Sequence, residues 1–361
     1  MNKTNKTNKR KFYGVFILKL LPIVFLFSEY TYSANEGQKK VDASITVIAA
    51  GDIEWTKHTL WAPRYLFLGA TNTLEDKTEE KYGKHALPLP SFPFITTDES
   101  KLYAKKRGVD VDKAGSHHIE AEQYNLVFDS EEKRNYHPFK RIAQLLRTAD
   151  VAFANLEMSL SDAGRSVGSF RAPTSMAKVL SWAGFDVLTT ANNHIFDSGE
   201  QGMFDTEQAL NENNIASFGT GRNLSEARKP HIVEKNGIKL AFLGYSQITN
   251  HWGGDFALSN RSGVAPLDSF LVAEDIKNIR NSVDFVIVSF HWGMENTQSI
   301  HPDIIELAHQ VMDAGADVIL GHSPHMPQAV EMYKNKPILY SLGNLVFGHN
   351  HDYWMDNILA R

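Results

Sequence analysis

Two histidines, His322 and His325, stand three residues apart in the segment LGHSPHMPQ. On a helix this spacing would place both imidazoles on one face, but Pro324 separates them and Pro327 follows. Because proline lacks a backbone N–H donor and clashes inside a helix, the segment is predicted to be stiff and non-helical. It directly follows the apolar run ADVILG, so a buried strand would present both imidazoles at its end.

Other polar residues also follow apolar runs, each at the carboxyl end of a predicted strand. They are Asp52, Asn155, Glu157, Asn192, Asn193, His194 and His291. Ligand crevices in open α/β sheets lie outside the carboxyl ends of the strands, so we expect these side chains to converge. Carboxylates, an amide and neutral imidazoles form the ligand set that Mn, Fe or Zn accepts, whereas a Ca or Mg site would contain fewer histidines.

Each of these residues also has a structural interpretation. Asp52, in AAGD, could be a turn residue, and His291 could be a core histidine beside Trp292. The segment ANNHIFDSGEQG is more specific, because it offers an amide for a metal, His194 as a proton donor and Asp197 as a carboxylate to orient that donor. The coincidence of all these features favours a metal or catalytic centre over turn chemistry.

The elements that must position these residues alternate between strand and helix. Buried-strand patterns are predicted at 44–52, 149–157, 185–194, 238–246, 283–293 and 316–325. Helical spacing lies between them, in PFKRIAQLLRTA, SMAKVLSWAG, MFDTEQALNENN, DSFLVAEDIKNIRNS and HPDIIELAHQVMDAG. In the last of these, Pro302 suits a first helical position and Gly315 a C-terminal stop. The alternation predicts a layered α/β domain with helices covering the sheet.

Composition limits the classes of function. The 361 residues are 42% hydrophobic, which is enough to bury a full core without disulfides. A formal net charge of -5 argues against nucleic-acid binding, which relies on clustered Lys and Arg. The chain has no cysteine, which excludes thiolate metal sites, a cysteine nucleophile and a cysteine-linked lipid anchor. Any metal must therefore be held by nitrogen and oxygen.

The N-terminus carries an export pattern. A cationic run, MNKTNKTNKRK, precedes the apolar run FYGVFILKLLPIVFLF and then small residues near Thr31 and Ser33. Residues 1–34 are therefore predicted to be a signal peptide or an N-terminal membrane anchor. The folded part is expected to be exported, to the periplasm, the cell surface or a membrane-anchored position.

A polar stretch at 61–135 interrupts the alternation and has no clear period. It is longer than a connector in a compact fold, so we interpret it as an insertion into the domain at 44–361. It could be a small subdomain, a lid on the substrate side or a partly disordered excursion.

The order of motifs from Ser44 to Phe347 resembles a known family. The motifs are GD, NLE, ANNHxxDxGxxG, HWGxE, GHxPH and YSLGN. This order is similar to that of the CapA proteins of bacterial capsule and poly-γ-glutamate synthesis, which in turn resemble the calcineurin-like metallophosphoesterases. The resemblance implies a metallophosphoesterase-like α/β/β/α sandwich. Its C-terminal strands could be incomplete, because the sequence stops at Arg361, soon after SLGNLVF.

The resemblance also implies roles for individual residues. The implied metal ligands are Asp52, Glu157, Asn193, His291, His322 and His325. His194 would be the catalytic histidine, supported by Asp197. Further candidate site residues are Glu54, Asn155, Asn192, Glu295 and Asn344. Glu54, in GDIE, replaces the apolar residue usual in CapA proteins and the histidine of the phosphoesterases.

The implied chemistry is hydrolysis assisted by two divalent cations, Mn, Fe or Zn, which would polarise a phosphoryl or acyl oxygen and activate a water. His194 would then donate a proton to the leaving group. The substrate would be a phosphoester or the γ-glutamyl amide of an anionic polymer, poly-γ-glutamate. Two other functions fit the same residues. One is a secreted metallophosphoesterase or nucleotidase unrelated to capsule, and the other a non-catalytic assembly subunit that binds polymer or membrane subunits of the capsule machinery.

Overall fold

The computed structural model describes residues 44–54, 135–163, 170–250, 255–347 and 358–361, and the backbone of two short strands at 13–15 and 23–28. Apart from these two strands, the predicted export segment lies outside the described residues. So does the predicted insertion at 61–135, except for Asn135. Among the described residues, none of the helices has the length and apolar character needed to span a membrane.

The first sheet has eight strands and carries the N-terminal half of the predicted site. Its order is β1 (Tyr13–Val15), β2 (Ile23–Ser28), β18 (Ile358–Ala360), β3 (Val47–Ile53), β4 (Val151–Leu156), β7 (Val187–Thr189) and β8 (Ala216–Phe218), with β17 (Asn344–Val346) also paired to β3. Neighbours from β3 to β8 are parallel, as is the pair β17 and β3. The carboxyl ends of β3, β4 and β7 therefore meet at one rim.

The second sheet has six strands and carries the C-terminal half. Its order is β10 (His231–Lys235), β11 (Ile238–Ser246), β13 (Phe285–His291), β14 (Val318–His322), β16 (Lys336–Leu339) and β15 (Val330–Tyr333). The strands β11, β13, β14 and β16 are parallel to their neighbours in this run, whereas β10 and β15 are antiparallel edge strands. Two short pairs lie outside both sheets: β5 (Ser159–Leu160) with β6 (Arg171–Ala172), and β9 (Thr220–Gly221) with β12 (Gly263–Val264).

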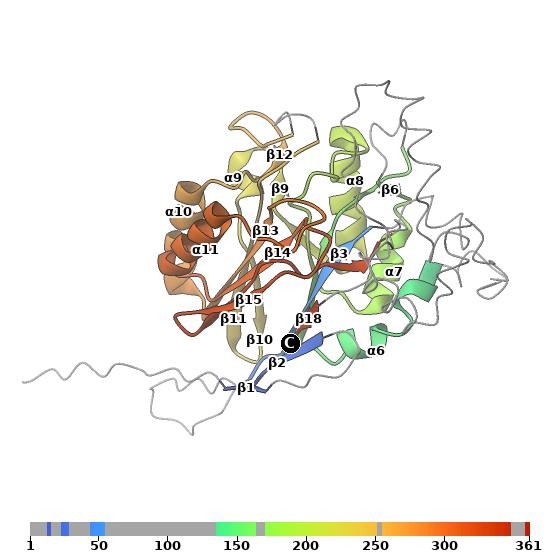
Figure 1. Ribbon diagram of the computed structural model, residues 1–361. Helices are drawn as coiled ribbons and strands as arrows, with labels where there is room; N and C mark the ends of the chain where they lie inside the picture. Colours follow the sequence, from blue (N-terminus) through green and yellow to red (C-terminus); the bar gives the residue numbers. More distant parts are fainter. Residues whose placement is uncertain are drawn as a thin grey trace, which may run out of the picture.

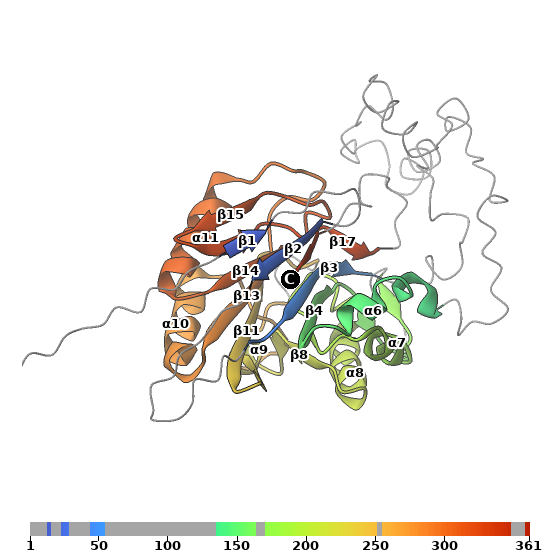
Figure 2. The ribbon, with the colours of Figure 1, turned by 90° about the horizontal axis from the view of Figure 1, so that it is seen from below.

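Three buried clusters define four layers. The middle cluster joins the facing sides of the two sheets and includes Phe153 of β4, Phe242 of β11 and Leu320 of β14. The rings of Phe153 and Phe242 stack across it, with centroids 5.9 Å apart. Helices cover the two outer faces, as Figures 1 and 2 show. The structure thus confirms the predicted α/β/β/α sandwich.

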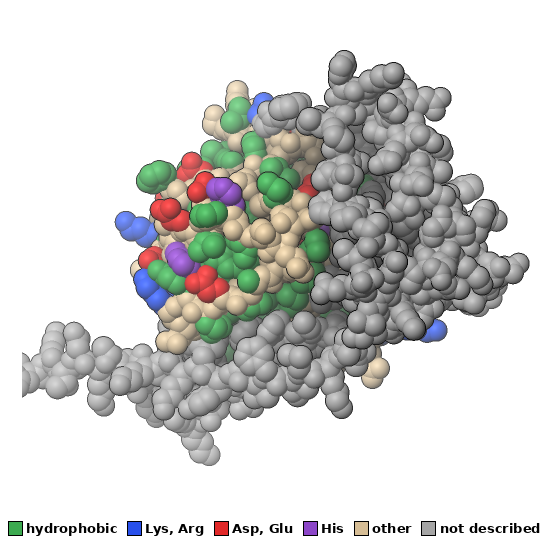
Figure 3. Space-filling model, viewed as in Figure 1, with side chains coloured by type: hydrophobic (Ala, Val, Ile, Leu, Met, Phe, Trp, Pro, Cys, Tyr) green, Lys and Arg blue, Asp and Glu red, His purple; other side chains and the backbone are tan. Residues whose placement is uncertain are grey.

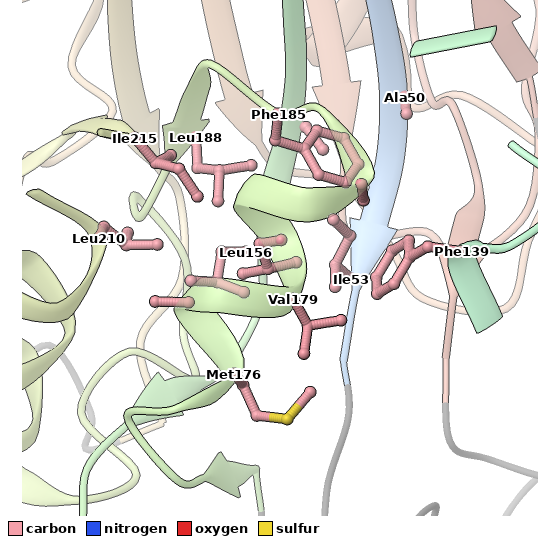
Figure 4. Packing of buried hydrophobic residues seen from close by; sticks show 14 of the residues in the cluster. Ala50, Ile53, Phe139, Leu156, Met176, Val179, Phe185, Leu188, Leu210 and Ile215 are labelled. Carbon is pink, nitrogen blue, oxygen red and sulfur yellow. The ribbon is translucent and has the colours of Figure 1, made fainter. Parts of the chain in front are cut away.

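The first sheet is covered by α6 (Ala143–Leu146), α7 (Met176–Ala183) and α8 (Gly199–Glu212). Figure 4 shows this interface, where Val179 of α7 points toward Ile53 of β3. The segment predicted as a helix from PFKRIAQLLRTA contains only a short 3-10 turn, η2 (His137–Phe139), followed by the single turn of α6.

The second sheet is covered by α10 (Ser269–Ile279), which continues into η3 (Arg280–Ser282), and by α11 (Pro302–Ala314). The predicted end signals of α11 are confirmed: Pro302 begins it, and Gly315, with φ +122°, ends it. A short helix, α9 (Leu224–Ala227), packs beside β9. On the face seen in Figure 3, acidic, basic and hydrophobic side chains are interspersed over α10 and α11.

Candidate metal centre

Strand register brings the predicted site residues to one rim of the two sheets. In the first sheet Asp52 of β3 lies opposite Asn155 of β4 on one side and Asn344 of β17 on the other. In the second sheet His291, the last residue of β13, lies opposite His322, the last residue of β14. Parallel neighbouring strands end at the same edge of a sheet. Polar residues at the ends of these strands are therefore brought together into one cluster.

Two glycines allow the backbone to close over this rim. A Cβ on Gly51 would lie 1.9 Å from the carbonyl oxygen of Gly343, and the Asp52 amide donates to that same oxygen at 2.9 Å. A Cβ on Gly321 would likewise lie 1.9 Å from the carbonyl oxygen of Tyr340. The glycines that precede Asp52 and His322 are therefore required for close backbone approach.

Asp52, Glu157 and His325 form the centre of the cluster. One ligand atom from each lies within 4.8 Å of the other two, and all three side chains are buried. His325 Nδ1 lies 3.6 Å from Asp52 Oδ2, and His325 Nε2 lies 3.7 Å from Glu157 Oε1. These separations are too long for hydrogen bonds but suit atoms that share an ion.

His322 and His291 flank this centre from the second sheet. His322 Nδ1 donates to Asp52 Oδ1 at 2.9 Å, which leaves the lone pair of Nε2 free. His291 Nε2 lies 3.7 Å from Glu157 Oε1. Within the described ranges, Nε2 of each ring is buried and has no hydrogen-bond partner. A buried imidazole nitrogen without a partner is costly unless it binds something.

The segment between the paired histidines has unusual backbone geometry. Ser323 and His325 have φ values of +94° and +58°, which are uncommon for residues other than glycine. The segment is not helical, as predicted. Backbone strain of this kind costs on the order of 1–3 kcal/mol per residue and is concentrated at functional sites.

Asn155 holds the two carboxyl groups by hydrogen bonds, and Asn192 holds Asn155. Asn155 Nδ2 donates to Asp52 Oδ1 at 2.9 Å and to Glu157 Oε2 at 3.4 Å. Asn192 Nδ2 in turn donates to Asn155 Oδ1 at 3.0 Å and to the Leu156 carbonyl oxygen at 2.7 Å. The amide nitrogen of Asn155 therefore faces the cluster, and both asparagines hold neighbouring side chains in place.

His194 and Asp197 form a pair beside the cluster. His194 Nδ1 donates to Asp197 Oδ2 at 3.0 Å, and the same carboxylate oxygen accepts from the Phe170 amide at 2.7 Å. The imidazole stacks on the Phe170 ring, with centroids 3.9 Å apart. Its side chain is 16% exposed whereas that of Asp197 is 2% exposed, so the histidine is the partner that can reach a substrate.

Two contacts of this pair were not predicted from the sequence. Phe170 has no motif of its own. Asn250 Nδ2 lies 3.2 Å from His194 Nδ1, and Asn250 Oδ1 accepts from Asn193 Nδ2 at 2.9 Å. Asn250 follows β11, whose polar end SQITN carries the same signal as the other strand ends.

The remaining candidates lie at the edge of the cluster. Asn344 Oδ1 accepts from His325 Nδ1 at 3.0 Å, so it orients that ring. Glu54 is buried beyond the end of β3, and its charge acts on Glu157. Glu295 is exposed but still close enough to act on Glu157. The structure therefore brings all the predicted residues to one rim, with Glu295 at its solvent side.

Burial and neighbouring charge shift the pKa values of the cluster. Burial raises the pKa of Asp52, but the hydrogen bond from His322 and the charges of nearby histidines bring it down to about 2. Burial and the charge of Asp52 raise the pKa of Glu157 well above its ordinary value. Burial lowers the pKa of His291 well below its ordinary value and also lowers that of His325. Both shifts favour the neutral imidazole, which is the form that binds metals.

The donor set fits a divalent transition metal. Two buried carboxyl groups lie close together, and a bound cation would relieve the repulsion that raises the pKa of Glu157. His325 contributes an imidazole to this group, and the rings of His291 and His322 lie beside its carboxyl groups. Asn193 Oδ1 is also buried, and among described residues it has no hydrogen-bond partner. Nitrogen and oxygen ligands of this kind suit Mn, Fe or Zn.

Comparison with known proteins identifies a family. The family described as "Bacterial capsule synthesis protein PGA_cap" matches residues 110–349. The matched range ends close to Phe347 but begins after Asp52. The structure nevertheless places Asp52 beside the other candidate site residues. The chain is 37% identical over 185 residues to "PGA biosynthesis protein CapA" of Bacillus subtilis, covering 51% of this chain and 48% of that protein. It is 30% identical over 235 residues to "Capsule biosynthesis protein CapA" of Bacillus anthracis, covering 62% and 56%.

Solved structures include weaker likenesses. The calcineurin-like phosphoesterase YfkN from Bacillus subtilis has a TM-score of 0.37 at 16% identity, covering 61% of this chain and 71% of that one. The sulfate thiohydrolase SoxB of Thermus thermophilus has a TM-score of 0.40 at 15% identity, covering 84% and 53%. The chain spans about half the length of the curated relatives it matches. Because the family match covers well over half of the sequence, the chain belongs to the bacterial capsule synthesis protein family PGA_cap.

Proposed function

We propose that this chain is a metal-dependent hydrolase that acts in capsule or poly-γ-glutamate biosynthesis. The relatives named for biosynthesis of PGA and of capsule support the biological setting. The single observation that carries the chemistry is the buried group of Asp52, Glu157 and His325, with His291 and His322 of the second sheet beside its two carboxyl groups. A purely structural role for this cluster would leave the buried nitrogens of His291 and His322 without compensation.

In the proposed mechanism, two divalent cations, Mn, Fe or Zn, would be held by Asp52, Glu157, Asn193, His291, His322 and His325. When bound, such cations polarise a phosphoryl or acyl oxygen and make water a nucleophile near neutral pH. His194 stands beside the ligands with Nδ1 fixed by Asp197, so its Nε2 donates a proton to the leaving group. Phe170, stacked on one face of the imidazole, restricts its rotation and excludes water from that face.

The His194–Asp197 pair favours catalysis over a structural metal site. A metal that only stabilised the fold would need no partly exposed, oriented proton donor next to its ligands. The substrate is proposed to be a phosphoester or the γ-glutamyl amide of poly-γ-glutamate, since the ligand set suits hydrolysis of either. We also propose that the protein is exported and works at the periplasm, cell surface or membrane, with the predicted segment 1–34 as its signal or anchor and capsule-synthesis subunits as partners.

Parallel assays separate these possibilities. The purified chain, supplied with Mn²⁺ or Zn²⁺, would be incubated with bis-p-nitrophenyl phosphate, with γ-glutamyl p-nitroanilide and with poly-γ-glutamate. Turnover that needs metal and disappears in His322→Ala is the expected result, and the substrate that is cleaved identifies the reaction. Retained polymer binding without turnover of any substrate would instead support a non-catalytic assembly subunit. Phosphodiester turnover without any effect on the polymer would support a phosphoesterase outside capsule synthesis.

A further inference from the structure

Asn250 occupies a position between the predicted metal ligands and the predicted proton donor. Its Oδ1 accepts from Asn193 Nδ2 at 2.9 Å. Its Nδ2 lies 3.4 Å from Asp197 Oδ1 and 3.2 Å from His194 Nδ1. One side chain from the loop after β11 thus contacts three residues that follow β7 of the first sheet.

The loop that carries Asn250 is fixed to the end of the neighbouring strand. The Gln247 amide donates to the His291 carbonyl oxygen at 2.8 Å, and Gln247 Oε1 accepts from the Gly293 amide at 2.8 Å. Ser246 Oγ donates to the Ile248 carbonyl oxygen at 2.7 Å. These bonds hold the first residues of the loop to the strand that supplies His291, so the position of Asn250 is coupled to the metal-binding rim.

The hydrogen bonds of Asn250 determine which end of the Asn193 amide faces the cluster. Asn193 Nδ2 is used by Asn250 Oδ1, so Asn193 Oδ1 is the end left buried without a hydrogen-bond partner in the described part of the chain. An amide oxygen binds a cation, whereas an amide nitrogen does not. The orientation of Asn250 is itself set, because its Nδ2 must point to the carboxylate acceptor of Asp197.

We propose that Asn250 is a positioning residue that aligns the Asn193 oxygen for a divalent cation and holds the His194–Asp197 pair next to it. The first half needs only a metal site, whereas the second half rests on the proposed hydrolase function. Asn250 acts through its neighbours. Its Oδ1 orients Asn193, and its Nδ2 holds Asp197, the partner of His194.

Two substitutions separate the two halves. Asn250→Ala removes both contacts. Asn250→Asp keeps an oxygen to accept from Asn193 but replaces the donor with a second carboxylate facing Asp197. Asn211→Ala, at an exposed position of α8, is the matched control for loss of an asparagine side chain.

The experiment measures Mn²⁺ affinity of the chelator-stripped full chain by titration calorimetry, and kcat and KM for bis-p-nitrophenyl phosphate with the metal restored. We expect Asn250→Ala to bind Mn²⁺ about 10-fold more weakly than the Asn211→Ala control. Asn250→Asp is expected to bind Mn²⁺ at least as tightly as the control while its kcat falls about 10-fold with little change in KM. A structural role alone would not divide affinity from kcat in this way.

Other outcomes overturn the proposal. Equal Mn²⁺ affinity in Asn250→Ala and Asn211→Ala, or an equal loss of affinity in Asn250→Ala and Asn250→Asp, contradicts the alignment of Asn193. Unchanged kcat in Asn250→Asp contradicts the role toward His194. If the unsubstituted chain hydrolyses none of the probes, the proposed function fails, while the Mn²⁺ affinities still decide the role of Asn250 toward Asn193.

Discussion

His322 Nδ1 donates to Asp52 Oδ1 at 2.9 Å, and this bond joins the carboxyl ends of two strands that belong to different sheets. The two residues are 270 positions apart in the chain. Because the carboxylate is the acceptor, the bond fixes the proton on Nδ1 and leaves Nε2 as the free ligand atom. The candidate metal-binding rim and the packing of the two sheets are therefore parts of one arrangement.

His194 is predicted to be needed for turnover but not for metal binding. His194→Ala should lower kcat about 10²- to 10⁴-fold, because the proton donor to the leaving group is lost. Elemental analysis should find the same metal content as in the unsubstituted chain, since the imidazole is bonded to Asp197 and not to the cluster. His301→Ala, whose side chain is 69% exposed, serves as the control and should change neither quantity. Loss of metal in His194→Ala would contradict this assignment.

Metal binding should stabilise the folded chain. A ligand that binds only the folded state adds about 2.7 kcal/mol at 100 times its dissociation constant. Addition of Mn²⁺ to the chelator-stripped chain should therefore raise the melting temperature, measured by circular dichroism. His322→Ala should show little of this rise. An equal rise in both proteins would place the cation elsewhere.

Phe153 is predicted to be critical for the contact between the two sheets. It is fully buried in the middle cluster, where it stacks on Phe242. Phe153→Ala should lower the free energy of unfolding by about 3–5 kcal/mol in urea denaturation, because it leaves a cavity between the sheets. The matched control is Phe270→Ala, since Phe270 is 84% exposed and should change stability by less than about 0.5 kcal/mol. Similar losses in the two variants would be inconsistent with the layered core.

Gly51 is predicted to be required for the close approach of β3 and the Gly343 turn. Gly51→Ala would place a methyl group 1.9 Å from a carbonyl oxygen, so the backbone beside Asp52 must shift. We expect a loss of about 1–3 kcal/mol in stability together with loss of bound metal. Gly237→Ala is the comparison: Gly237 has φ +76° but no atom near its Cβ position, so this variant should lose about 1 kcal/mol and keep its metal. Full metal content in Gly51→Ala would refute the role of this contact.

Six strands of the two sheets could be predicted from the sequence because each lies in a longer apolar run that is mostly buried. β4, β7, β11, β13 and β14 lie within predicted runs, and β3 extends one residue beyond its run, to Ile53. The strands β8, β15, β16 and β17 were not predicted, since each has only three or four residues and no clear period. The helix expected from PFKRIAQLLRTA is mostly turns, because its apolar residues contact the sheet over single turns and tertiary packing overrides the helical spacing.

The candidate site residues could be predicted where a carboxylate, amide or imidazole side chain stands at the carboxyl end of a predicted strand. Asp52 and His322 follow that rule, and register then brings them together. The direction of an amide was not predictable, because it depends on partners that are distant in sequence. Asn155 turns its nitrogen toward Asp52. Asn250 was missed for the same reason: its three partners all lie more than 50 residues away.

Metal content of the purified chain, measured by elemental analysis beside the His322→Ala variant, tests the central claim most directly. We predict about two divalent cations of Mn, Fe or Zn per unsubstituted chain. His322→Ala is predicted to lose most of this metal while it keeps the circular dichroism spectrum of the folded protein. Equal metal content in the two proteins, or an unsubstituted chain that binds none of these cations when they are supplied, would contradict the account.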